Sequence, residues 1–250
     1  MKTIAVVEDN PDNRLLVRVI LEPFYIIVEY ETGFAALEGL RRQKPDLVLL
    51  DVSLPGMDGT EVLRQIRADN SLRQLPVIAL TAHAMAGDRQ KYVATGFDDY
   101  ISKPIVDENT LLEAILRKLP DSRPVPASSA KGASELNAIT IERLQRLGGA
   151  QFAIDMIDLF LSYSAQKLVE ARASLKAGKL EELADAVHPI KSSAGNVGAT
   201  RIQDLCGAIE DSARHNRPEP LAPRLAELEQ AFAEVKPRLE AEKARLQKKP

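Results

Sequence analysis

Residues 1–119 alternate between two hydrophobic patterns, and this alternation constrains the fold more than any other feature of the chain. Short runs that are apolar at every position are typical of strands buried on both faces of a parallel sheet. The segments between these runs repeat their apolar residues at helical spacing, and Pro11, Gly33 and Gly59 stand at loop-to-helix junctions. The pattern predicts a doubly wound α/β domain with a five-stranded parallel sheet. Its strands are expected at 4–7, 26–28, 47–50, 77–80 and 100–101, and its helices near 12–21, 33–43, 59–68, 85–94 and 107–119.

Five polar side chains follow these predicted strands directly: Glu8, Asp9, Asp51, Thr81 and Lys103. In an open α/β sheet, ligands bind beyond the carboxyl ends of the strands, so we expect these side chains to converge. Three carboxylates in one place repel one another unless a cation intervenes, and hard oxygen ligands suit Mg²⁺. An aspartate in such a site can attack phosphorus, while an ammonium and a hydroxyl group stabilise charge on the transferring group.

The segments that contain these residues resemble a response-regulator receiver domain. The likeness extends over the whole of residues 1–120 and implies the flavodoxin-like fold. It rests on five motifs: Val6-Val7-Glu8-Asp9-Asn10, Leu50-Asp51, Leu54-Pro55-Gly56-Met57-Asp58-Gly59, Ala79-Leu80-Thr81-Ala82 and Tyr100-Ile101-Ser102-Lys103-Pro104.

The resemblance implies that Asp51 is the phosphoacceptor and that the domain catalyses its own aspartate phosphorylation and dephosphorylation. The implied Mg²⁺ ligands are Glu8, Asp9, Asp51 and the backbone carbonyl of Ser53. An aspartyl-phosphate hydrolase of the haloacid dehalogenase type is the rival class. Such enzymes carry a second aspartate two positions after the nucleophile, where this chain has Ser53, so the general acid of that class is missing.

Two further features of the receiver family have counterparts in the chain. Thr81 and Tyr100 match the family's switch pair, in which the hydroxyl moves toward the phosphoryl group and the aromatic ring rotates inward. Lys103-Pro104 matches a cis peptide of the family, and X–Pro is the bond type that tolerates the cis form.

The second half of the chain has a different organisation. Residues 120–134 are rich in Pro, Ser and Ala and predict a linker between a first domain at 1–119 and a second at 135–247. The second domain shows only helical periodicity, which predicts an antiparallel all-α four-helix bundle. We expect a short helix ending at Gly148-Gly149, a long one stopping near Gly178, a helix around His188, a helix at 202–209 and a last helix at 221–246. Two prolines, Pro223 and Pro237, are expected to interrupt the last helix.

His188 lies in a setting that suits phosphoryl chemistry. His188, Lys191 and Gly195 are spaced i, i+3 and i+7, so they share one helix face. An exposed imidazole on that face can be a nucleophile toward phosphorus, and Lys191 one turn away favours the phosphoryl dianion. His83 and His215 have no such setting.

This half resembles a histidine phosphotransfer (HPt) domain over roughly 135–235. The matching segments are His188-x-x-Lys191, Asn196-Val197-Gly198-Ala199 and Met156-Ile157-Asp158-Leu159-Phe160. The resemblance implies that His188 carries phosphate on an imidazole nitrogen and that Lys191 stabilises it. Two positions depart from the family. Ser192 stands where the family often has Gly, and Pro189 removes the N–H that would bond the carbonyl of Asp185. We expect Pro189 to kink the helix, which either tilts His188 outward or degrades the site.

Charge and cysteine content narrow the class of protein. The net charge is -3, without the basic excess of a nucleic-acid-binding protein. The single cysteine, Cys206, excludes an internal disulfide and suits a reducing compartment, and its helical pattern indicates buried packing. The first ten residues are too short an apolar run for a signal peptide, and no run approaches a membrane span. We expect a cytoplasmic protein that binds neither nucleic acid nor membrane.

The combined features predict a phosphorelay protein. A sensor or hybrid histidine kinase would phosphorylate Asp51, and His188 would exchange phosphate with a receiver aspartate in this chain or in a downstream response regulator. No Gly-rich nucleotide motif is present, so no ATP-binding kinase domain is expected. Two alternatives stay open. In the first, phosphorylation of Asp51 gates partner access to the bundle; in the second, the chain is a sink that drains phosphate from a pathway.

Overall fold

The computed structural model describes residues 1–81, 94–105, 107–120, 138–215, 217 and 220–248. The chain divides into two compact units, 1–132 and 133–250. From residue 121 onward, the predicted linker lies outside the described residues, as do most of the helix expected at 85–94 and His83. No helix in the described ranges is long and apolar enough to cross a membrane.

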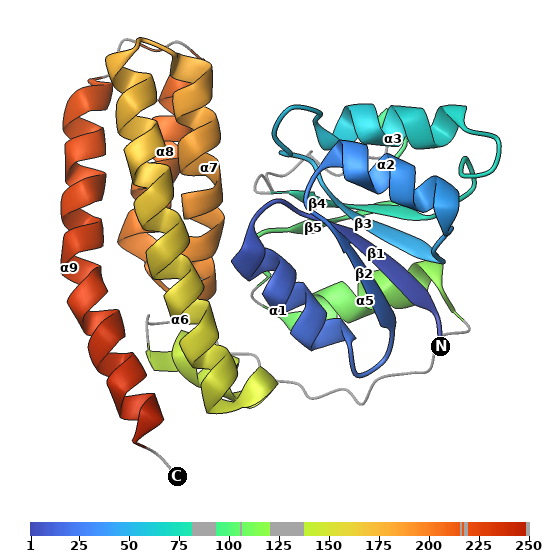
Figure 1. Ribbon diagram of the computed structural model, residues 1–250, viewed down its shortest axis with the longest axis horizontal. Coiled ribbons are helices and arrows are strands. Elements are labelled where there is room, and N and C mark those ends of the chain that lie inside the picture. Colours follow the sequence, from blue (N-terminus) through green and yellow to red (C-terminus); the bar gives the residue numbers. More distant parts are fainter. Residues whose placement is uncertain (82–93, 106, 121–137, 216, 218–219, 249–250) are drawn as a thin grey trace. The chain divides into compact units, whose positions relative to one another are not determined.

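The first unit is a five-stranded parallel sheet between two layers of helices (Figure 1). The strand order is β2-β1-β3-β4-β5, and Figure 1 shows α2 and α3 on one face and α1 and α5 on the other. The strands are β1 (Thr3–Val7), β2 (Ile26–Tyr30), β3 (Leu47–Asp51), β4 (Val77–Thr81) and β5 (Asp99–Ser102). The helices are α1 (Pro11–Leu21), α2 (Gly33–Arg42), α3 (Gly59–Ala68) and α5 (Glu108–Lys118). The prediction of a doubly wound sheet is confirmed.

The central strands carry the core of this unit. Every residue of β3 and β4 is buried, as expected of strands covered by helices on both faces. Helix α3 begins at Gly59 because the side chain of Asp58 accepts a hydrogen bond from the Glu61 amide at 2.9 Å. Position 59 requires glycine because the backbone of β3 lies too close for a side chain. A Cβ there would lie 2.2 Å from the carbonyl oxygen of Asp51. The start of α3 therefore rests directly on the end of β3.

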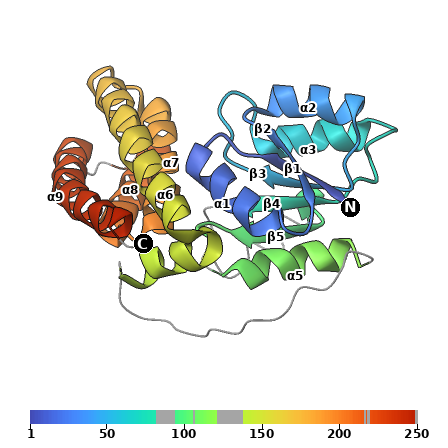
Figure 2. The ribbon, with the colours of Figure 1, turned by 60° about the horizontal axis from the view of Figure 1, so that its bottom comes forward.

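The second unit is a bundle of α6 (Ala138–Lys176), α7 (Leu180–Val197), α8 (Thr200–Arg214) and α9 (Leu221–Gln247). Helix α6 packs on α7 and α9, and α8 packs on the same two helices (Figure 2). Gly149, with φ of 81°, divides α6 into the two helical segments that the sequence predicts. The prediction of an all-α bundle is confirmed.

The prolines interrupt this bundle less than predicted. The expectation that Pro223 and Pro237 break the last helix is wrong, because α9 is continuous from Leu221 to Gln247. Pro223 lies in the first turn, where the amide has no intrahelical partner to lose. Pro237 lies in the interior, but Phe232 and Leu239 on either side of it are buried and hold the helix against the bundle. Helix α7 likewise runs through Pro189 without ending there.

Candidate functional sites

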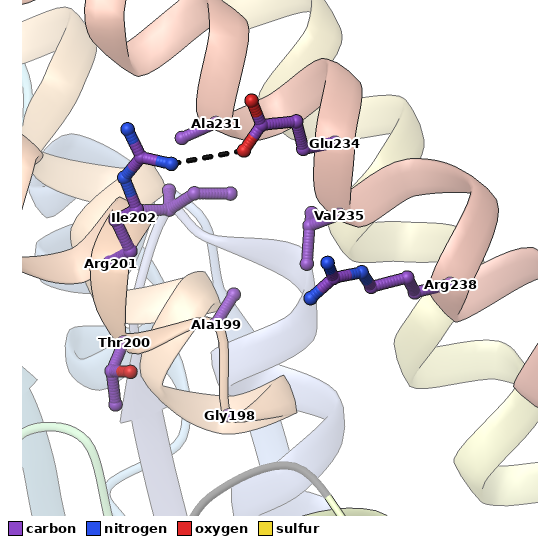
Figure 3. A pocket seen from close by; sticks show the side chains of 9 residues that line it. All are labelled: Gly198, Ala199, Thr200, Arg201, Ile202, Ala231, Glu234, Val235 and Arg238. Carbon is purple, nitrogen blue, oxygen red and sulfur yellow. Dashed lines mark hydrogen bonds and ion pairs between the residues drawn. The ribbon is translucent and has the colours of Figure 1, made fainter.

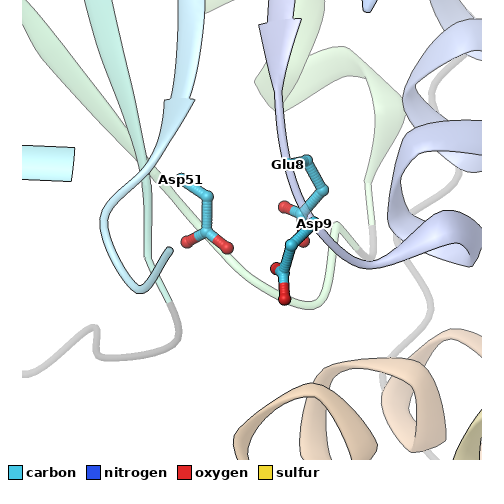
Figure 4. A group of neighbouring side chains, drawn as sticks. All are labelled: Glu8, Asp9 and Asp51. Carbon is cyan, nitrogen blue, oxygen red and sulfur yellow. The ribbon is translucent and has the colours of Figure 1, made fainter. Parts of the chain in front are cut away.

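Three carboxylates meet at the carboxyl edge of the sheet (Figure 4). Glu8 and Asp9 follow β1, and Asp51 is the last residue of the neighbouring strand β3. Each offers an oxygen within 4.8 Å of the others. Glu8 and Asp51 are buried and Asp9 is partly exposed, so the cluster is open on the side of Asp9.

Lys103 neutralises part of this charge. Its Nζ donates to Asp51 Oδ2 at 2.7 Å and to Glu8 Oε2 at 3.1 Å. Burial would lower the pKa of Lys103, but the negative charges of Asp51 and Glu8 outweigh it and raise the pKa above its usual value. The lysine is therefore a fixed cation against the acidic cluster. The Lys103-Pro104 peptide is cis, as the resemblance implies.

The surroundings of Glu8 disfavour the charged form of its carboxyl group. Burial and then the charge of Asp51 raise its pKa to about 8. Asn13 on α1 donates to its Oε1 at 2.9 Å, which fixes the side chain's orientation. A divalent cation would relieve this repulsion, and three carboxylates form the hard oxygen donor set that Mg²⁺ prefers. These residues therefore fit a magnesium ion.

The remaining predicted residues of this site lie around the cluster. Ser53 donates its amide to Asp51 Oδ1 at 3.0 Å, which orients the carboxylate. Thr81 is buried at the end of β4, one residue beyond Leu80, the register partner of Asp51. Tyr100 on β5 is half-buried and packs against the hydrophobic core.

His188 lies inside the bundle rather than on its surface. The expectation of an exposed imidazole is wrong, because His188 is only 4% exposed. Its ring is turned toward α8, where Nδ1 lies 2.7 Å from Oε1 of Glu210. The other ring nitrogen, Nε2, has no hydrogen-bond partner among the described residues. A carboxylate at Nδ1 favours the tautomer with the proton on Nδ1, which places the ring's lone pair on the buried Nε2.

Glu210 is a candidate site residue that the sequence analysis missed. Burial would raise its pKa, but the hydrogen bond from His188 and the charge of Lys191 hold it well below the usual value. Lys191 donates to its Oε2 at 3.2 Å, so this lysine pairs with the carboxylate beneath the histidine. One signal was present in the sequence. Glu210 stands four residues after Cys206 on the buried stripe of α8, where a carboxylate needs a partner.

Other reactive side chains lack the features of a site. Burial raises the pKa of the Cys206 thiol, so it is inert packing. His215 is exposed and bonds to Asp211 one turn away. A cavity of about 220 Å³ opens between the start of α8 and α9 (Figure 3). Arg201 at its edge is paired with Glu234 at 2.9 Å, and neither Asp51 nor His188 lines it.

The fold and the sites define a class of protein: a doubly wound domain with a strand-end acidic cluster, joined to a helical bundle with a buried histidine. Residues 4–116 match the family model of the response regulator receiver domain, and residues 155–238 match that of the Hpt domain. The polar-differentiation response regulator DivK of Brucella anthropi is 42% identical over 105 residues, covering 42% of this chain and 85% of DivK. The chain belongs to the response-regulator receiver family and carries an Hpt domain after its receiver domain.

Longer relatives align with most of the chain. The signal transduction histidine-protein kinase BarA of Escherichia coli K12 is 33% identical over 238 residues, covering 90% of this chain and 26% of BarA. The sensor protein GacS of Pseudomonas syringae is 30% identical over 226 residues, covering 86% of this chain and 25% of GacS. The chain thus spans about a quarter of the length of these kinases. Among solved structures, the magnesium-bound receiver domain of a sensor histidine kinase from Pseudomonas aeruginosa PAO1 is 35% identical, covers 48% of this chain and 98% of that one, and has a TM-score of 0.44.

Proposed function

We propose that the chain relays phosphoryl groups through two acceptors, Asp51 in the receiver domain and His188 in the Hpt domain. One observation carries the proposal. A carboxylate cluster that fits a cation and a buried histidine whose Nε2 accepts no hydrogen bond from any described residue occur on one polypeptide, each in the domain type that uses it.

The receiver step begins with a phosphohistidine on a sensor or hybrid histidine kinase. An oxygen of Asp51 attacks phosphorus, the P–N bond breaks, and the donor imidazole leaves. Magnesium held by Glu8, Asp9, Asp51 and the Ser53 carbonyl would supply charge neutralisation on the phosphoryl oxygens when bound. Lys103 and Thr81 would contribute an ammonium and a hydroxyl to the same group. Thr81 and Tyr100 would then carry the change of state to the surface.

The Hpt step uses the asymmetry of the His188 ring. Nε2 attacks the phosphorus of an aspartyl phosphate, a P–O bond breaks, and the aspartate leaves as a carboxylate. Phosphorylation of Nε2 while Nδ1 retains its proton makes the ring positive. The carboxylate of Glu210 stabilises this charge without moving a proton. Lys191 would turn from Glu210 toward the new phosphoryl dianion. The receiver aspartate is Asp51 or that of a downstream response regulator.

The proposal includes transfer between Asp51 and His188 within one chain but does not require it. A phosphohistidine donor made from ATP implies a cytoplasmic location, which we include in the proposal.

The test compares the wild type with Asp51→Asn and His188→Ala after incubation with a phosphodonor. Acyl phosphate is labile in base, and phosphohistidine is labile in acid. Label on His188 that disappears with Asp51→Asn supports relay within the chain. Label confined to Asp51, with bundle binding that responds to it, favours the switch alternative. Absence of label at Asp51 refutes the proposal.

A further inference from the structure

Arg14 on α1 contacts the acidic loop, the segment after β1 that contains Glu8 and Asp9. Its Nη1 donates to the backbone carbonyl of Glu8 at 2.7 Å and to that of Asp9 at 2.8 Å. Its Nη2 donates to Glu31 Oε1 at 2.6 Å, just beyond the end of β2. The Arg14 side chain is 12% exposed, so most of this fork lies inside the domain.

These carbonyls belong to the two residues whose carboxylates would hold the metal. Each carbonyl lies in the peptide plane that follows its residue, so a hydrogen bond to the carbonyl fixes the orientation of that plane. Fixing both planes fixes the directions in which the Glu8 and Asp9 side chains leave the backbone. A second tie exists nearby, since the Glu8 amide donates to the carbonyl of Tyr30 at 3.1 Å. Arg14 and β2 together hold the acidic loop in one conformation.

We infer that Arg14 is a positioning residue for the divalent cation, an inference that rests on the proposed function of the acidic cluster. By holding the two peptide planes in place, it orients the carboxylates of Glu8 and Asp9. Partners of this kind change metal affinity by about 10- to 100-fold when they are removed.

Simple electrostatics predicts the opposite change in cation affinity, so the direction of the change distinguishes the two explanations. Arg14 is a cation near the site, so removing its charge should tighten binding of another cation. If orientation of the loop dominates, removing it should weaken binding. Lysine keeps the charge but concentrates its donors on one nitrogen, which cannot span both carbonyls and Glu31.

Arg18, one turn further along α1, provides a matched control. It also forms a forked pair with an acidic side chain of β2, donating to Glu29 at 3.1 and 2.7 Å. No hydrogen bond joins Arg18 to the acidic loop in the described part of the chain. Arg18→Ala therefore removes the same charge from the same helix, together with a comparable ion pair.

The experiment measures Mn²⁺ binding to the full chain by electron paramagnetic resonance, for the wild type, Arg14→Ala, Arg14→Lys and Arg18→Ala. We expect Arg14→Ala to raise the Kd about 10- to 100-fold, Arg14→Lys to fall between it and the wild type, and Arg18→Ala to stay within about twofold. Hydrogen exchange at the Glu8 amide, measured without metal, should be faster in Arg14→Ala alone. An Arg14→Ala Kd equal to or below that of the wild type overturns the inference. Absence of Mn²⁺ binding by the wild type would instead overturn the proposed metal site and this inference with it.

Discussion

Gly59→Ala should damage the Asp51 site without touching any reacting side chain. The new Cβ would lie 2.2 Å from the carbonyl oxygen of Asp51 and 2.8 Å from the Cα of Val52. An ordinary carbon–oxygen contact is about 3.3 Å, so the end of β3 and the start of α3 must separate by about 1 Å. A misplacement of that size costs a reaction about 100-fold in rate. We expect Gly59→Ala to slow phosphorylation of Asp51 by about that factor.

Gly39→Ala is the matched control. A Cβ there would also meet an atom at 2.2 Å, but that atom is the hydroxyl oxygen of Tyr30. The far end of a tyrosine side chain can rotate away, whereas the backbone at Asp51 cannot move without moving the acceptor. The assay is the initial rate of base-labile label formation from a small phosphodonor at saturating Mg²⁺, with circular dichroism to confirm folding. A Gly59→Ala rate within threefold of wild type, or equal slowing in both variants, would refute the reasoning.

Substitutions at three further positions test interactions within each unit. Glu210→Ala leaves the proton on His188 Nδ1 without its acceptor and should cost the bundle about 2–3 kcal/mol in urea unfolding, more than Glu210→Gln. Because the pKa of Glu210 is depressed on folding, its contribution is complete above the pKa of an unfolded glutamate and is lost as the pH falls below it. The stability of Glu210→Gln should therefore change less than that of the wild type between pH 5.5 and 3.5, and an identical acid loss would contradict the assignment. Gly207→Ala should stabilise α8 by about 0.5–1 kcal/mol, because alanine favours a helix and the new Cβ meets Lys191 at an ordinary contact distance of 3.5 Å. A lower urea midpoint for this variant would argue against this packing. Arg67→Ala should cost about 2–3 kcal/mol, because Arg67 donates to three backbone carbonyls and to Asp98, and Arg67→Lys should recover less than half of that loss.

The fold of the receiver domain could be predicted closely because short stretches of sequence are enough to recognise its strands. A strand buried on both faces is recognisable from a few consecutive residues, as in Leu47–Asp51. Parallel strands also place their carboxyl ends at one edge, so residues far apart in sequence converge once the topology is known. Asp51 and Lys103 are 52 positions apart, yet both follow strands, and their side chains meet at 2.7 Å. The contacts of Arg14 were missed because they involve backbone carbonyls, which no side-chain pattern reveals.

The prolines of the bundle show that burial of neighbouring side chains can outweigh the tendency of proline to break a helix. A proline inside a helix removes one hydrogen bond at a cost of about 3 kcal/mol, which is enough to break an isolated helix. Burial of a single large side chain offsets about 1.5–3 kcal/mol of this. Phe232 and Leu239 flank Pro237 and are both buried against the bundle. Helix α9 therefore continues through Pro237. A prediction from the proline alone does not include the burial of the side chains around it.

The two proposed acceptor sites differ in what determines their geometry. At Asp51, strand order and strand ends bring the polar side chains together, so residue type and position along the chain suffice. At His188, the decisive contact depends on the rotation of α7 and α8 about their axes, because only one pair of facing positions brings Glu210 within 2.7 Å of Nδ1. Periodicity indicates which stripe of each helix is buried but not which polar residues on the two stripes face each other. The same contact turns the imidazole inward and selects the tautomer with a free Nε2. The contact with the carboxylate on α8 therefore determines the tautomer on which the proposed phosphotransfer depends, although sequence periodicity does not reveal this contact.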